Sequence, residues 1–319
     1  QRVYPSGSGP ATFSAQYLLI GTGPVTVQPG TTTALAAGSA NGYTLYQAGL
    51  LSSPAVTLAA GECQEIQGSL LVTGTISAAP GVTTSTAPTL LLGGHGSSSS
   101  QILFSTTSAI ASPLHLETLA LVGASQVTYG SGITMTPNNL VIGGGGSLTG
   151  TAGSSLTVGT STQLFGSIIG AAGQTLALKD LTVNGLGSSV AIEGGTLNLT
   201  NLSVNAGSGL NVSVPSGTVA NTGAITVAAA SGSRSAGSLS ISTQTLSSVG
   251  ATIAGTTTLT SSTSTTMTGS TVVTGAATMN LSGNGTVTIT SLAAPAGQTG
   301  TVVKTSGAGT LAFQTVSSG

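Results

Sequence analysis

The sequence predicts an all-β protein whose second half stacks as a parallel β-solenoid behind a β-rich N-terminal region. Three observations favour this fold class. They are a very low content of charged residues, a composition of small and β-branched side chains punctuated by 49 glycines, and an internal sequence repeat. An antiparallel β-sandwich, or a string of them, is the alternative architecture.

Charged side chains are scarce along the whole chain. Asp, Glu, Lys and Arg make up 3% of the 319 residues, and the formal net charge is −1. An ordinary soluble domain contains roughly 25% charged residues. Charge keeps monomers apart, protects strand edges and supplies acid–base chemistry. We therefore expect a self-assembling structural protein, not an enzyme.

The hydropathy of the chain argues against two other classes. Hydrophobic residues make up 39%, and the mean hydropathy is +0.44, whereas disordered chains combine low hydrophobicity with high net charge. The apolar runs are short, while a membrane-spanning helix needs roughly 18 consecutive apolar residues. Val and Thr favour strands, and Gly and Ser favour the turns between them. We expect many short strands and no membrane span.

An internal repeat supports the stacked architecture. Residues 175–184 read TLALKDLTVN and residues 196–205 read TLNLTNLSVN, an offset of 21 residues. Apolar residues two apart point to one face of a strand. The three-residue step inside the motif re-phases this alternation, as expected of a corner between two short strands that face one core. Repeats of this length are typical of stacked coils, each of which buries the apolar face of its neighbour.

The composition changes near residue 140, because every tyrosine and most prolines precede it. Glycine clusters punctuate structure, and residues 143–146 are four consecutive glycines. We therefore expect five segments. They are an extended arm (1–30), a β-rich domain (31–142), a Gly-rich joint (143–155), a solenoid-like domain (156–296) and a C-terminal segment (297–319).

Two segments resemble known fibrous families. The stretches GGTLNLT (194–200) and NTGAITV (221–227) lie in a region, residues 172–290, that resembles the β-helical passengers of autotransporters and filamentous haemagglutinins. This resemblance implies an exported surface adhesin with a long parallel β-helix. Residues 297–313 are similar to segments of viral and phage fibre proteins, with Phe313 in the usual place of Trp. That second resemblance implies a fibrous protein.

Residues capable of chemistry do not form a recognisable site. The spacing of Cys63, His95 and His115 matches no zinc pattern. Glu62 and Glu65, three residues apart, would face opposite sides of a strand. We expect no catalytic residue, no cofactor and no metal. Four basic residues cannot form a nucleic-acid-binding stripe, so no nucleic-acid partner is expected.

The N-terminal arm is a candidate subunit-linking strand. An extended segment of this kind can add to the sheet of a neighbour, which would join copies head to tail into an open filament. The alternative is that this segment forms the first strands of its own domain. The candidate linking residues are Tyr17, Leu18, Leu19, Ile20, Val25 and Val27.

The second half also carries candidate glycosylation sites. N-x-S/T sequons mark surface positions in secreted proteins of a glycosylating host. They occur at Asn198, Asn201, Asn211, Asn280 and Asn284.

These observations predict a structural subunit of an extracellular or surface fibre whose main partners are copies of itself. The chain begins with Gln1, from which we expect export to a secreted, cell-surface or virion-surface location. The alternative is an adhesin or a viral or phage fibre protein that binds glycans or a receptor on a cell surface. In that case the Tyr-bearing residues 1–130, including Tyr43 and Tyr46, would form the recognition part.

Overall fold

A computed structural model shows strands between Thr12 and Ser317. Side chains are described for residues 118–121, 126, 128–129, 134–274, 277–298 and 300–304. Within these described residues all regular secondary structure is β-strand, which confirms the all-β prediction. The chain divides into two compact units, Gln1–Gly159 and Thr160–Gly319.

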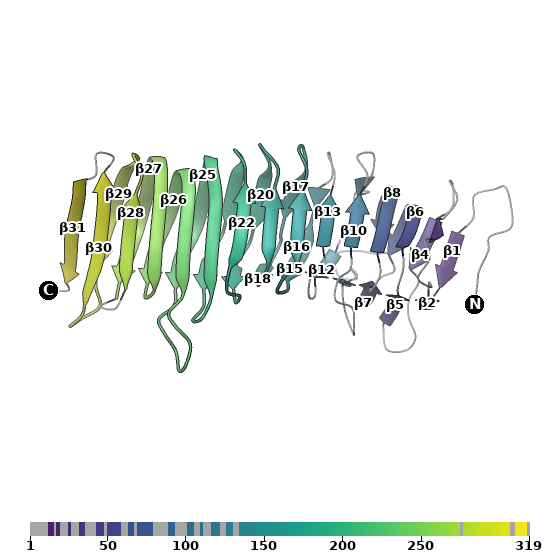
Figure 1. The fold of residues 1–319 in the computed structure, drawn as a ribbon, viewed down its shortest axis with the longest axis horizontal. Helices are drawn as coiled ribbons and strands as arrows, with labels where there is room; N and C mark the ends of the chain where they lie inside the picture. The colour runs from purple at the N-terminus through teal and green to yellow at the C-terminus, as the bar shows by residue number, and fades with distance from the viewer. Residues whose placement is uncertain are drawn as a thin grey trace. The chain divides into compact units, whose positions relative to one another are not determined.

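The described strands of the first unit are β1 to β17 (Figure 1). They are β1 (Thr12–Ala15), β2 (Tyr17–Leu19), β3 (Val25–Thr26), β4 (Thr32–Leu35), β5 (Tyr43–Gln47), β6 (Leu50–Leu58), β7 (Cys63–Ile66), β8 (Ser69–Ala78), β9 (Thr89–Leu92), β10 (Gln101–Phe104), β11 (Ala109–Ile110), β12 (Leu116–Leu121), β13 (Gln126–Tyr129), β14 (Thr134–Met135), β15 (Pro137–Ile142), β16 (Ser147–Gly150) and β17 (Ser155–Thr157).

Strands of the first unit pair in parallel with strands several elements away in sequence. One ladder runs β2–β5–β7–β9–β12–β15. A second ladder runs β3–β6–β8–β10–β13–β16. Parallel neighbours that are never sequence neighbours require the chain to wind round and return, which is the topology of a solenoid. The four glycines at residues 143–146 form a turn between β15 and β16, in which Gly145 has φ 81°.

The second unit contains the remaining strands. They are β18 (Ser161–Leu164), β19 (Ser167–Gly170), β20 (Thr175–Leu178), β21 (Leu181–Val183), β22 (Ser188–Ile192), β23 (Thr196–Leu199), β24 (Leu202–Val204), β25 (Gly209–Val227), β26 (Ser238–Ile253), β27 (Thr256–Val273), β28 (Thr278–Ser282), β29 (Thr286–Ala293), β30 (Thr299–Ser306) and β31 (Thr310–Ser317).

Strands of the second unit form a parallel β-solenoid with three faces per coil. The first face contains β19, β22, the beginnings of β25 to β27, and then β28 and β30. The second face contains β20, β23, the middles of β25 to β27, and the first part of β29. The third face contains β18, β21, β24, the ends of β25 to β27 and the end of β29.

The 21-residue repeat is confirmed as two successive coils. Thr175 pairs with Thr196 and Leu176 with Leu197, while Leu181 pairs with Leu202 on the next face. The predicted corner lies at Asp180, which has φ 45° and separates β20 from β21. The 21-residue offset is therefore the length of one coil. Adjacent coils in such a ladder lie about 4.8 Å apart.

The core is a set of apolar columns that run along the stacked coils. On the second face Leu176, Leu197 and Val219 are each 0% exposed, and Leu246 is 1% exposed. Further along, polar side chains enter the interior, including Thr257 (0% exposed), Ser261 and Thr265 (1% each). Ser261 and Thr265 hydrogen-bond each other at 2.9 Å, whereas the hydroxyl of Thr257 has no hydrogen-bond partner among the described residues.

Candidate functional site

Acidic, basic and metal-ligating side chains are dispersed in the described part of the chain. No group of three or more His, Cys, Asp or Glu residues comes together there. The described residues also contain no helix that is long and apolar enough to cross a membrane. The side chains of Cys63, Glu62, Glu65, His95 and His115 lie outside the described residues.

The candidate linking strand is partly visible at the backbone level. Tyr17–Leu19 forms β2, which pairs in parallel with β5, and Val25–Thr26 forms β3, which pairs with β6. Both are the first strands of their ladders among the residues whose backbone is described. Ile20, Val27 and the side chains of Tyr17, Leu18, Leu19 and Val25 lie outside the described residues, so the subunit-linking role stays a prediction.

The sequon asparagines differ in their environments. Asn198 and Asn211 are exposed on strands, Asn280 is half-buried and Asn284 is exposed in the turn before β29. Asn201 is exposed but engaged, because its Nδ2 donates to Oδ1 of Asp180 at 2.7 Å and its Oδ1 accepts from the Ala224 amide at 3.2 Å. Glycosylation at these positions remains a prediction.

Asparagine also forms rungs between successive coils. The last residue of each sequence repeat is an asparagine, and Nδ2 of Asn205 donates to Oδ1 of Asn184 at 2.6 Å. Asn201 and Asp180 make the equivalent rung at the neighbouring corner. These polar contacts align the corners of adjacent coils, so their role is structural and not chemical.

At the C-terminal end of the described solenoid, part of the core is only half-buried. β29 is the last strand of the second face among the described residues, and it pairs with β27. Its inward positions Val287 and Ile289 are only half-buried. Their register partners one coil earlier, Thr265 and Met267, are 1% and 0% exposed. Among the described residues, the core column on this face therefore ends at β29.

The first face ends differently at the same terminus. β30 is flanked by β31, which pairs with it antiparallel and ends the run of parallel strands. Val302 in β30 is accordingly only 4% exposed. Lys304 pairs with the buried Leu281, so it occupies an inward position of the last coil on this face. An inward charge is a common device against edge-to-edge association.

β29 itself carries no such charge. The strand reads TVTITSLA and contains neither a charged residue nor a proline. Unpaired backbone groups on an edge strand of this kind are a template for pairing with another chain. The candidate functional site is therefore an assembly surface, formed by β29 with Val287 and Ile289 at its centre. Sequence reasoning missed both this edge and the position of Lys304.

Comparison with known proteins adds no relative to this picture. No family model matches the chain, and neither a curated protein nor a solved structure matches it.

Proposed function

We propose that the chain is a structural subunit of an extracellular or surface filament that grows end to end. The observation that carries this proposal is the end of the described core at β29, where Val287 and Ile289 are half-buried while deeper residues of the same columns are buried. The scarcity of charge supports it as well, because the chain lacks the repulsion that keeps ordinary soluble domains apart.

The occupant of the β29 edge is the first coil of a second copy. β2 is the first described strand of the parallel ladder that leads coil by coil to the last part of β29, so β2 of a second copy would continue that parallel order beyond β29. A contact between the last coil of one copy and the first coil of the next joins two different surfaces. Such heterologous contacts produce open filaments when the rotation does not close a ring.

The test places a charge at the core end. Ile289→Lys puts an ammonium group at the contact, and burying an unpaired charge costs several kcal/mol. A loss of roughly 3 kcal/mol raises the critical concentration for filament growth about a hundredfold. Sedimentation and negative-stain electron microscopy at neutral pH measure this concentration. Ser240→Lys, at an exposed position of β26, is the matched control and leaves growth unchanged.

Two further results decide the proposal. Deletion of residues 1–20 removes β1 and β2, and we expect it to stop growth in the same way. Filaments that form equally well from Ile289→Lys and from the wild type would remove β29 from the assembly surface. Monomers at every concentration of the wild-type chain would refute the filament, and glycan binding would then favour an adhesin.

A further inference from the structure

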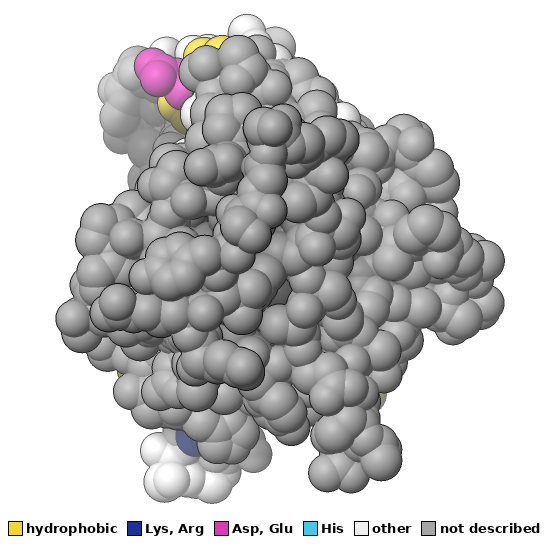
Figure 2. Space-filling view, turned by 90° about the vertical axis from the view of Figure 1, so that its right-hand side faces the viewer, with side chains coloured by type: hydrophobic (Ala, Val, Ile, Leu, Met, Phe, Trp, Pro, Cys, Tyr) yellow, Lys and Arg dark blue, Asp and Glu magenta, His cyan; other side chains and the backbone are white. Residues whose placement is uncertain are grey.

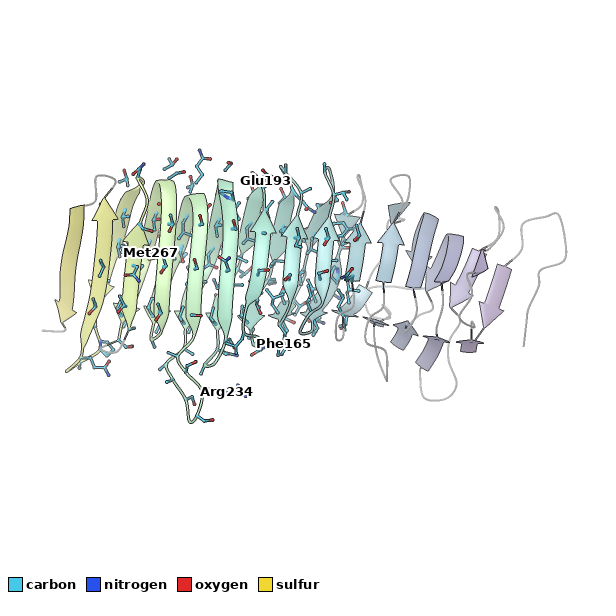
Figure 3. All side chains as sticks on the ribbon, in the orientation of Figure 1. Phe165, Glu193, Arg234 and Met267 are labelled. Atoms are coloured by element: carbon cyan, nitrogen blue, oxygen red, sulfur yellow. The ribbon has the colours of Figure 1, made fainter. Side chains whose placement is uncertain are left out.

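A small hairpin protrudes from one corner of the second unit. Residues 228–237 connect β25 to β26, and register partners here are 29 residues apart (Val212 and Ile241), compared with 22 on the preceding coil (Val190 and Val212). The insertion projects from the solenoid at the lower edge of Figure 3, where Arg234 is labelled. Insertions into stacked repeats often form the binding face.

Hydrogen bonds give this hairpin a defined shape. The Gly237 amide donates to the Ala228 carbonyl at 2.9 Å, and Ser231 and Arg234 exchange amide-to-carbonyl bonds at 3.1 and 3.0 Å. The turn between them has Gly232 at φ 59°, which is the position that a two-residue hairpin turn reserves for glycine. The hairpin is therefore a built element that holds Arg234 at a fixed place.

The hairpin is anchored on the coil beside it. The Gly207 amide donates to the Ser235 carbonyl at 2.7 Å. A Cβ atom on Gly207 would meet the Cβ, Cγ and Cδ atoms of Arg234 at 3.3–3.4 Å, so the Arg234 stem lies directly over this glycine. On the two earlier coils the same corner presents Leu186, 81% exposed, and Phe165, 37% exposed. We call Phe165, Leu186 and Arg234 the Arg234 corner.

Another corner of the same coils has the opposite charge and little bulk. Glu193 is exposed in the turn between β22 and β23. Small residues occupy the matching positions of three successive coils beside it, namely Gly173, Gly194 and Ser216. The Gly173 N–H donates a hydrogen bond to the Glu193 carbonyl, and a Cβ atom on Gly194 would lie 3.7 Å from the Cβ of Ser216. We call these four residues, together with Pro215, the Glu193 corner. It offers a shallow surface with one carboxylate and no large side chain.

The two corners lie at opposite edges of the unit. Glu193 is labelled at the upper edge of Figure 3, and Phe165 and Arg234 at the lower edge. The visible acidic and basic side chains likewise occupy opposite edges of the space-filling view in Figure 2. Among the described residues the other exposed charges, Lys179 and Asp180, are adjacent at a third corner and balance each other.

We propose that the Arg234 corner of one copy docks against the Glu193 corner of a second copy, so that neighbouring solenoids associate side by side. The Arg234 guanidinium meets the Glu193 carboxylate, while Leu186 and Phe165 cover the small-residue surface of the partner. A second copy fits each corner by charge, because one corner carries the positive Arg234 side chain and the other carries the negative Glu193 side chain. This lateral contact rests on the proposed filament function and would join filaments into bundles or sheets.

Charge reversal tests the contact. Arg234→Glu places two carboxylates face to face, and Arg234→Glu combined with Glu193→Arg restores opposite charges. An exposed ion pair changes association about fivefold per contact, and the effect multiplies along two aligned filaments. Electron microscopy should show bundles for the wild type and the double variant, and single filaments for Arg234→Glu. Lys179→Glu, the same charge change at the third corner, leaves the bundles intact.

The outcomes separate this inference from the filament itself. Single filaments of Arg234→Glu with normal length show that end-to-end growth is independent of the lateral contact. Wild-type bundling of Arg234→Glu, or a double variant that fails to bundle, would overturn the lateral contact and leave the filament standing. If the wild type forms no filament, sedimentation equilibrium measures the dimerisation of the same variants. The lateral contact is overturned unless the wild type and the double variant dimerise more strongly than Arg234→Glu.

Discussion

Truncation of a core leucine gives a quantitative test of the coil register. Leu197 in β23 is 0% exposed and stacks between Leu176 and Val219, which are also 0% exposed. Leu→Ala at such a site removes buried methylene groups and leaves a cavity, at a cost of about 2–5 kcal/mol. We take about 3 kcal/mol for Leu197→Ala. The matched control is Leu186→Ala, at a leucine that is 81% exposed, where we expect about 0.5 kcal/mol or less.

The difference in unfolding free energy between the two variants can be measured as a difference in melting temperature. Unfolding entropy is about 2.1 cal/mol/K per residue, so the second unit, residues 160–319, has roughly 0.34 kcal/mol/K. A loss of 3 kcal/mol lowers Tm by about 9 °C, and the control lowers it by at most about 1.5 °C. Thermal melts by circular dichroism at a concentration below assembly measure both. Equal shifts for the two variants would show that Leu197 does not face the core, and the register argued above would be wrong.

Two further substitutions test the corners and the interior. Gly217→Ala adds a Cβ that collides with the Gly195 backbone of the preceding coil. We expect the free energy of unfolding, measured in a urea melt, to fall by about 2 kcal/mol or more. An unchanged midpoint would mean that the coils do not approach each other closely at this corner. Thr257→Val removes a hydroxyl that is fully buried and unpartnered among the described residues, so we expect a gain of about 1 kcal/mol in the same melt; destabilisation would indicate that a bound water satisfies the hydroxyl.

Local patterns predicted the regular part of the solenoid well. The repeat at residues 175–184 and 196–205 predicted the inward leucines and valines and the corner at Asp180. These features are readable because the alternation of side chains in a strand and the re-phasing at a corner are properties of the local chain.

Features that depend on long-range register could not be read from the sequence. Register partners are 29 residues apart at Val212 and Ile241 but only 18 apart at Ile241 and Leu259. Because the number of residues per coil varies in this way, the sequence of β25 to β27 has no constant repeat length. It shows only irregularly spaced apolar residues. The inward position of Lys304 and the half-buried state of Ile289 likewise follow from which strand pairs with which. Neither property is encoded in the residues adjacent to them.

Fibre diffraction from aligned filaments of the wild-type chain tests the central claim most directly. If solenoids grow end to end through β29, their strands lie across the filament axis and successive coils repeat along it. End-to-end growth predicts a strong meridional reflection at about 4.8 Å. Filaments whose 4.8 Å reflection falls on the equator would have strands along the axis, and that result would contradict end-to-end growth of a parallel β-solenoid.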